Sequence, residues 1–314
     1  MRISVIIPTY NSEKTIGKLI ESLLRQTVQP LEIIVVDGNS TDSTEDVCAA
    51  FKSKLIRFIK NPSGHETGTN RNIGADSAKG DHLLFLDSDC TCDKDLIKAY
   101  VEEFSKDPNT DSSVVCVAGN VLVANPGDIS NKAYISERFL LYNNLKDGFI
   151  KGTFFWVMNF CIRKDKFIRF PDTSYSEDMV FIEKLFKTGM RVKFCKSAIA
   201  YHTYVETEEA FFRKRLKTAK GFIEQKESIT DIKEGSYFDI ILRLLKLDTE
   251  KIIKMIKDKS ICLDKSRGVV LDGHATNEYR FQNILLLSTA VAVLEYKGIK
   301  LEDSYEKLIR EYCI

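Results

Sequence analysis

Short apolar runs alternate with helix-like stretches along the first 120 residues. The apolar runs predict strands at residues 3–7, 31–36, 55–59, 82–86 and 113–117. Apolar residues recur at helical spacing over residues 16–24, and the stretches 43–51, 69–78 and 94–104 are also expected to be helical. Buried strands that alternate with helices predict an α/β fold, with a mainly parallel sheet covered by helices on both faces.

The pattern changes after residue 120. A helix is expected over 131–145, and another over 178–187 with Gly189 as its stop. Short strands are expected at 192–195 and 198–202. From residue 206 the pattern is largely helical, with a continuous amphipathic candidate over 240–256 and a more apolar one over 278–296. These patterns predict a domain over 1–225 and a helical C-terminal region over 226–314.

Composition and charge narrow the classes of partner. The 46 basic and 45 acidic residues give a net charge of +1, so no nucleic-acid partner is expected. The eight cysteines sit mostly in apolar runs, which favours buried thiols in a reducing cytoplasm. The spacing of Cys90 and Cys92 does not suit a zinc site. The longest apolar stretch has about 11 residues, against roughly 20 for a membrane span. We therefore expect a cytoplasmic protein, with peripheral contact at the inner face of a membrane left open.

Polar residues follow several predicted strands, where parallel strands would present them at one edge of the sheet. The most informative are Asp87 and Asp89, which follow the apolar run 83–86. Residues i and i+2 of a strand point the same way, and two adjacent carboxylates repel each other unless a cation neutralises them. Oxygen ligands suit Mg²⁺ or Mn²⁺. Alternatively, these acids are solvated loop residues or cap the helix that follows.

An ordered set of motifs gives the chain a family resemblance. The segments 5–11 (VIIPTYN), 34–42 (IVVDGNSTD), 71–75 (RNIGA) and 78–81 (AKGD), which leads into 87–89 (DSD), resemble the family 2 glycosyltransferases of GT-A fold. A second block, 176–180 (SEDMV), is similar to the acceptor-side motif of that family. The resemblance implies an inverting transfer from a nucleotide diphosphate sugar. It assigns donor binding to residues 1–120 and acceptor binding to residues 121–225.

The resemblance also implies roles for individual residues. Asp178 would be the general base that removes the proton of the acceptor hydroxyl. Trp156 and Glu177 would bind the acceptor, which is a glycan, a lipid-linked acceptor or a protein. Mn²⁺ or Mg²⁺ would be held by Asp87, Asp89 and His202. The donor would bind to Pro8, Tyr10, Asn11, Asp37, Arg71, Asp87 and Ser88. Gly38 stands where relatives often have a second acid, so the resemblance does not identify the nucleobase of the donor nucleotide.

Each of these residues also has a structural interpretation. Asp37 starts an Asp-Gly turn, and Arg71 could pair with Asp76 or Glu66 at the surface. Asp178 could be an acid at a helix N-terminus, where the helix dipole favours it. A histidine that follows a strand is often structural, which applies to His202, and core packing accounts equally well for Trp156.

A basic stretch over 213–220 alternates with apolar residues. It is either a solvated helix face or a site for the donor diphosphate or for an anionic or lipid-phosphate acceptor. Within it, Arg215 could bind the diphosphate or close a lid over the donor.

Two other functions are compatible with part of this pattern. A sugar nucleotidyltransferase of similar fold would carry a glycine-rich loop near its N-terminus, whereas this chain has Pro8-Thr9-Tyr10-Asn11. A catalytically inactive sugar-binding relative would have no reason to keep Asp87, Asp89 and Asp178 together.

Overall fold

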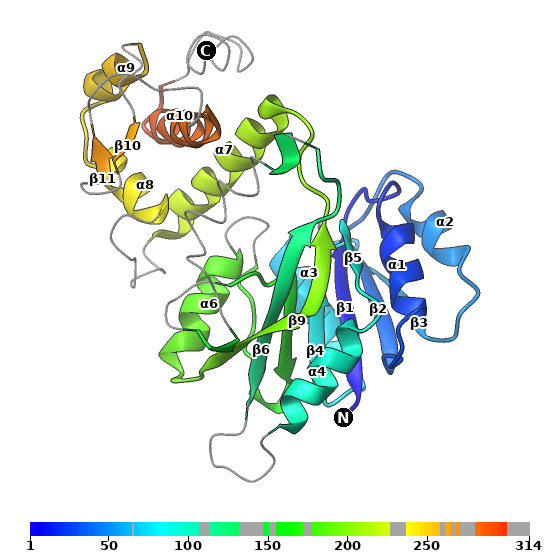
Figure 1. Ribbon diagram of the computed structural model, residues 1–314. Coiled ribbons are helices and arrows are strands. Elements are labelled where there is room, and N and C mark those ends of the chain that lie inside the picture. The colour runs from blue at the N-terminus through cyan, green and yellow to red at the C-terminus, as the bar shows by residue number, and fades with distance from the viewer. Residues whose placement is uncertain are drawn as a thin grey trace. The chain divides into compact units, whose positions relative to one another are not determined.

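The structure is a computed structural model, and it describes residues 1–64, 66–106, 114–127, 129–131, 147–150, 155–172, 177–226, 237–257, 262–264, 268–270 and 280–299. The chain folds into two compact units. Unit 1 comprises Met1–Ala124 and Asn144–Thr203, and unit 2 comprises Asn125–Asn143 and Tyr204–Ile314. This border precedes the division at 225/226 expected from the sequence, because helix α7 (Glu208–Gln225) packs against α10 (Arg280–Tyr296) (Figure 1).

Unit 1 is built on a nine-stranded sheet with the order β3-β2-β1-β4-β8-β6-β9-β5, and β7 pairs with β9. The first four strands pair in parallel, and β8 runs antiparallel between β4 and β6. The prediction of a mainly parallel sheet is therefore confirmed. The strands are β1 (Ile3–Thr9), β2 (Glu32–Asp37), β3 (Ile56–Lys60), β4 (His82–Leu86), β5 (Cys90–Cys92), β6 (Cys116–Val123), β7 (Gly148–Phe149), β8 (Asn159–Arg163) and β9 (Val192–His202).

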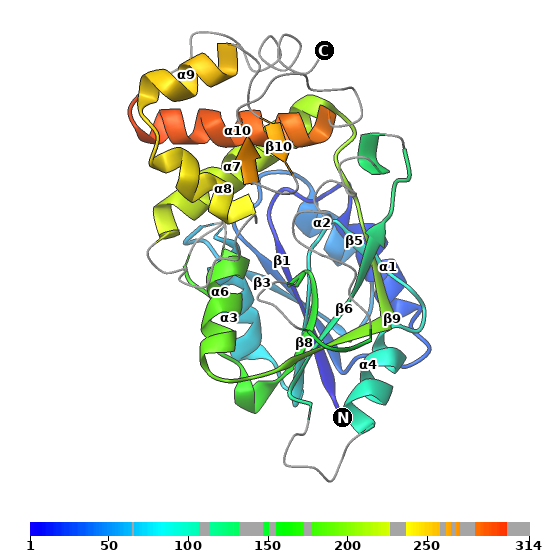
Figure 2. The ribbon, with the colours of Figure 1, turned by 60° about the vertical axis from the view of Figure 1, so that its left-hand side comes forward.

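Helices cover both faces of this sheet, as Figures 1 and 2 show. One face carries α1 (Ile16–Leu24), α2 (Thr44–Ala49) and α4 (Leu96–Ser105), and the other carries α3 (Thr67–Ser77) and α6 (Glu177–Lys187). Alternate side chains of β1 point to opposite faces of the sheet. Val5 belongs to the core under α1 and α4, whereas Ile6 packs against α3. A short 3₁₀ helix, Lys164–Lys166, follows β8.

The last long strand of unit 1 differs from the prediction of two short strands. Residues Val192–His202 form one strand, β9, whose pairing with β6 shifts register between Gly119 and Asn120. Gly119 pairs with Cys195 and Asn120 with Ile199, so three residues of β9 are passed over. The polar residues Lys196 and Ser197 that suggested a break are accommodated in this irregularity.

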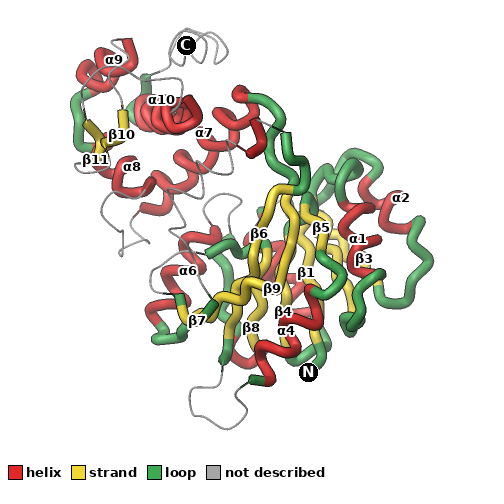
Figure 3. The backbone as a smooth tube through the Cα atoms, viewed as in Figure 1, coloured by secondary structure: helices red, strands yellow, loops and turns green. Residues whose placement is uncertain are grey.

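Unit 2 is mainly helical, as predicted (Figure 3). The predicted helix over 240–256 is in fact two helices, α8 (Tyr237–Leu245) and α9 (Thr249–Lys257). A turn at 246–248 separates them, and Asp248 accepts a backbone hydrogen bond from Ile252 at the new helix start. Strands β10 (Cys262–Asp264) and β11 (Gly268–Val270) form a hairpin. The helix expected over 131–145 lies almost wholly outside the described residues.

Within the ranges that the structure describes, no helix is both long and apolar enough to cross a bilayer. The apolar segment 286–294 of α10 is instead completely buried by its neighbours in unit 2.

Two helical glycines make a matched test of how closely the helices pack. A Cβ on Gly74 of α3 would lie 2.4 Å from Ile6 Cγ2, whereas a Cβ on Gly17 of α1 would lie 3.2 Å from Val47 Cγ1. Alanine is the better helix former by up to about 1 kcal/mol, but overpacking costs about 1–3 kcal/mol. We expect Gly74→Ala to destabilise the protein by about 1–2 kcal/mol in urea unfolding. Gly17→Ala should be neutral or stabilising, and equal effects of the two variants would contradict this packing.

Candidate active site

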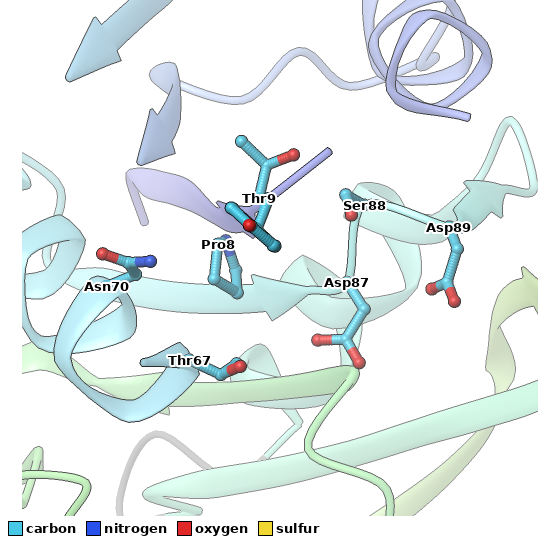
Figure 4. Close-up of a pocket in the computed structure, with 8 residues that line it drawn as sticks. Pro8, Thr9, Thr67, Asn70, Asp87, Ser88 and Asp89 are labelled. Atoms are coloured by element: carbon cyan, nitrogen blue, oxygen red, sulfur yellow. The ribbon is translucent and has the colours of Figure 1, made fainter. Parts of the chain in front are cut away.

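The predicted meeting of strand ends is present in unit 1. The end of β1 and the turn that follows β4 line a pocket of about 220 Å³. In Figure 4, Pro8 and Thr9 lie in the view between helix α3 and the 87–89 turn. The lining residues are Pro8, Thr9, Tyr10, Thr67, Asn70, Asp87, Ser88 and Asp89. Four of the residues assigned to the donor from the sequence (Pro8, Tyr10, Asp87 and Ser88) therefore share one pocket.

Hydrogen bonds join the loop after β1 to the loop after β2 beside this pocket. The backbone N–H of Asn11 donates to Ser40 Oγ at 2.8 Å, and Asn11 Oδ1 accepts from the backbone N–H of Thr41 at 2.8 Å. Asn11 and Asn39 both have positive φ, at 48° and 66°, a conformation that asparagine tolerates better than most residues. Asn11 is thus placed to hold the loop, and it does not line the pocket.

Asp37 has the geometry of the turn residue that was the alternative interpretation. Its carboxylate accepts from Ser40 at both the backbone N–H, at 3.0 Å, and the hydroxyl, at 2.5 Å. The side chain is buried at the end of β2. Asp37 therefore fixes the loop 38–40, and its assignment to the donor stays a prediction.

The two acids after β4 lie in a turn, closed by a hydrogen bond from Cys90 N–H to the Asp87 carbonyl. The strand rule for residues i and i+2 therefore does not apply to them, and their carboxylates have different partners. Asp87 Oδ1 accepts from Arg71 Nη2 at 2.7 Å, and Asp89 Oδ2 lies 3.1 Å from His202 Nε2. Ser88 is tied to the β1 loop, with its hydroxyl 2.9 Å from that of Ser12.

Arg71 is buried, and neither surface pairing considered from the sequence occurs. Its Nη1 donates to Glu177 Oε1 at 2.6 Å while its Nη2 binds Asp87. Only 3% of its side chain is exposed, and its Nε has no hydrogen-bond partner among the described residues. Burial acts to lower the pKa of the guanidinium, but the two carboxylates outweigh it and raise that pKa above its ordinary value, so Arg71 stays a cation. One buried cation thus joins the 87–89 turn to the first residue of α6.

Glu177 and Asp178 begin helix α6, where acids are favoured by the helix dipole. Burial raises the pKa of Glu177 to about 7, against the attraction of Arg71 and with help from the neighbouring charge of Asp178. Asp178 is partly exposed, and its Oδ1 accepts from the backbone N–H of Met179 at 2.8 Å. Glu177 is therefore mainly a partner of Arg71, while the partly exposed Asp178 suits contact with a ligand.

The Asp89–His202 pair suits a divalent cation. Antiparallel pairing places Cys90 opposite His202, and Thr203 N–H donates to the Asp89 carbonyl, so the backbone fixes both residues. Their 3.1 Å separation matches the roughly 3 Å between adjacent ligands of an octahedral ion bound at about 2.1 Å. No cluster of three or more His, Cys, Asp or Glu that could hold a metal is found among the described residues. Asp87 contacts Arg71 instead.

The remaining assignments fall elsewhere. Trp156 is buried, with 9% of its surface exposed, in a region rich in phenylalanine, as core packing would require. Arg215 belongs to unit 2. Thr67 and Asn70, which lie one helical turn apart on α3, also line the pocket, and so does Thr9. None of the three is among the site residues predicted from the sequence. The spacing of Thr67, Asn70 and Arg71 on one helix was the available signal.

Comparison with known proteins adds the family. The model of the family "Glycosyl transferase family 2" matches residues 4–170, which include β1, the 87–89 turn and β8. The chain belongs to this family. It is a glycosyltransferase, because its curated relatives share that activity class.

Among its relatives, the glycosyltransferase is 26% identical to the O-antigen chain rhamnosyltransferase RfbN of Salmonella typhimurium, over 69% of this chain and 71% of that one. It is 37% identical to the poly(ribitol-phosphate) β-N-acetylglucosaminyltransferase TarS of Staphylococcus aureus, over 34% of this chain and only 20% of that protein.

Solved structures show the same fold. TarS residues 1–349 in complex with UDP-GlcNAc has a TM-score of 0.54 at 18% identity, covering 96% of this chain and 93% of that one. The mannosyltransferase PcManGT of Pyrobaculum calidifontis, in complex with GDP-Man and Mn²⁺, has a TM-score of 0.53 at 17% identity, covering 99% and 79%. The GT-A-type fold is therefore established for this chain.

The raised pKa of Glu177 predicts a pH-dependent stability. Between pH 4.5 and about 7, folded Glu177 retains a proton that the unfolded chain has released. The free energy of unfolding therefore falls as the pH rises over this range, and the contribution of Glu177 is lost once the pH passes 7. We expect Glu177→Gln to be more stable relative to wild type at pH 8 than at pH 5, by about 1–3 kcal/mol. Urea unfolding at the two pH values measures the difference.

Glu21 provides the control for this measurement. It forms an exposed i,i+4 ion pair with Arg25, so Glu21→Gln should shift stability equally at both pH values. A Glu177→Gln variant that behaved like Glu21→Gln would show that Glu177 is ionised normally in the fold.

Proposed function

We propose that this enzyme is a metal-dependent, inverting glycosyltransferase that moves a sugar from a nucleotide diphosphate sugar to an acceptor hydroxyl. The observation that carries the proposal is the pocket at the ends of β1 and β4, in which Asp87 and Asp89 line one wall. Pro8 and Tyr10 provide apolar and aromatic surface suited to a nucleoside. Tyr10 is 43% exposed, so its ring is accessible for stacking.

The divalent cation, Mn²⁺ or Mg²⁺, would be held by Asp89 and His202, with Asp87 as the third ligand. When bound, it would neutralise the charge that develops on the leaving diphosphate. The acidic lining supports this assignment, because a pocket that contains Asp87 and Asp89 would otherwise repel a diphosphate. The complex of PcManGT with GDP-Man and Mn²⁺ is a precedent on the same fold.

Asp178 would accept the proton of the attacking hydroxyl. Its partial exposure at the start of α6 supports this role, and the Arg71–Glu177 contact ties that helix end to the pocket wall. A single in-line displacement would invert the anomeric centre. The acceptor would be a glycan, a lipid-linked acceptor or a protein, and Trp156, Glu177 and Arg215 remain predicted contacts with acceptor or diphosphate. Family membership favours transfer over the nucleotidyl chemistry weighed from the sequence.

The metal assignment is tested by replacing one of two histidines. We expect His202→Gln to weaken Mn²⁺ binding by about tenfold or more. It should therefore lose most of the rise in melting temperature that Mn²⁺ with UDP or GDP gives the wild type. His82→Gln is the control, since His82 pairs with Asp81 at the opposite end of β4. Equal Mn²⁺ responses in the two variants would rule out His202 as a ligand, and donor hydrolysis that survives EDTA would rule out metal dependence.

The catalytic assignment is tested at Asp178. Asp178→Asn keeps an oxygen to accept from Met179 but loses the base, so turnover should fall by about 10²–10⁴. Binding of the nucleotide with Mn²⁺ should not change. Asp172→Asn, which alters an exposed partner of Thr69, should retain wild-type turnover. A fully active Asp178→Asn enzyme would require another base.

A further inference from the structure

Arg71 is a buried cation that is shared between two carboxylates. Its guanidinium contacts carboxylates from two segments that lie 16 and 106 residues away along the chain. The residues that line the pocket include two acids and no lysine or arginine. Arg71, which does not line the pocket, is therefore the counter-ion of Asp87 within the described site.

The two ends of this bridge differ in exposure. The side chain of Glu177 is 9% exposed, whereas that of Asp87 is 29% exposed and lines the pocket. Asp87 Oδ2 accepts no hydrogen bond from a described residue. A ligand of the pocket can therefore reach the carboxylate that Arg71 holds, but it cannot reach Glu177 as readily.

We propose that Arg71 is a positioning residue that competes with the divalent cation for Asp87 and so couples cation binding in the pocket to the first turn of α6. This proposal rests on the proposed function, because it takes the cation site at Asp89 and the base at Asp178 from it. A cation bound at the 87–89 turn would attract the Asp87 carboxylate and weaken its interaction with Arg71. The guanidinium would then interact more strongly with Glu177. The residue next to Glu177 is Asp178.

The next residue along α3 explains how the rest of this contact stays in place. Asn72 Nδ2 donates to the Phe170 carbonyl at 3.0 Å, and Asn72 Oδ1 accepts from the Phe170 N–H at 3.0 Å. The Phe170 ring stacks on Phe181 of α6, with centroids 4.0 Å apart, and lies 5.2 Å from the Arg71 guanidinium. Packing thus fixes the second turn of α6 near α3, so that the ion pair of Arg71 with Glu177 acts on the first turn of α6.

A competing counter-ion makes a prediction that a structural ion pair does not. Removing the positive charge of Arg71 should tighten cation binding. Coulomb repulsion between the guanidinium and a divalent cation on the same carboxylate weakens the affinity for the cation by about tenfold, even in water. Removing Glu177 alone should weaken cation binding, because the full charge of Arg71 is then directed at Asp87. A merely structural role, or a role in holding the donor, gives no such opposite pair of effects.

The experiment measures Mn²⁺ affinity without donor, by electron paramagnetic resonance at pH 8. We expect Arg71→Met/Glu177→Gln to bind Mn²⁺ about tenfold more tightly than wild type, and Glu177→Gln alone to bind it several-fold more weakly. The double variant is used because Arg71→Met alone would leave a buried carboxylate unpaired and could unfold the protein. In transfer assays the double variant should lose kcat while its tighter Mn²⁺ binding persists, since the first turn of α6 is no longer held.

The matched control is Arg57→Met/Glu32→Gln, which removes another partly buried Arg–Glu pair of unit 1, with a 2.7 Å contact, away from the pocket. Its Mn²⁺ affinity should equal that of wild type. If Asp89→Ala binds Mn²⁺ as well as wild type, the proposed metal site is wrong, and the competition falls with it. If Mn²⁺ binding depends on Asp89 but the Arg71 double variant binds no more tightly than wild type, the competition alone is refuted.

Discussion

A single buried guanidinium holds together the two parts of the site that come from distant stretches of the chain. Arg71 is 3% exposed and binds both Asp87, after β4, and Glu177, at the start of α6. Burying a charge is costly unless it is paired, and here one cation is shared between two acids. The turn that would hold the metal and the helix that carries Asp178 are therefore fixed to the same side chain. Both are held by the two terminal nitrogens of one guanidinium, Nη2 for Asp87 and Nη1 for Glu177.

The sheet supplies the second constraint. Asp89 and His202 are 113 residues apart in the numbering, yet the β5–β9 ladder pairs Cys90 with His202, next to Asp89. The β9 strand reaches this position only because its register with β6 shifts at Gly119. A Cβ on Gly119 would meet Asn159 Nδ2, the Ala198 carbonyl and Tyr100 Oη at 2.3 to 2.6 Å, so the irregularity requires glycine there. Close packing at the centre of the sheet thereby decides which residue of β9 lies beside the 87–89 turn.

Much of this arrangement could be predicted from the sequence because it depends on local signals. The apolar runs identified β1, β2 and β4, and the polar residues after them identified the edge where the pocket lies. What could not be predicted depends on long-range pairing. No local signal shows that Arg71 would face Asp87 and Glu177, or that Asp87 and Asp89 would take different partners in a turn. The break between α8 and α9 was missed although Asp248 and Thr249 are typical of a helix start.

The electrostatics of the pocket connect these observations to the chemistry of a glycosyltransferase. A nucleotide diphosphate sugar would bring negative charge to a pocket whose lining already includes Asp87 and Asp89, while the buried cation Arg71 is shared between Asp87 and Glu177. The described lining of the pocket has two acids and no lysine or arginine, so a bound donor would add to an uncompensated negative charge. This charge favours binding a cation together with the donor. In the proposed competition, Arg71 would neutralise Asp87 in the absence of a cation, and it would interact mainly with Glu177 once a cation shared Asp87. The helix that begins with Glu177 and Asp178 would then be held most firmly when donor and cation are both present, which is the state in which a base next to the acceptor is useful.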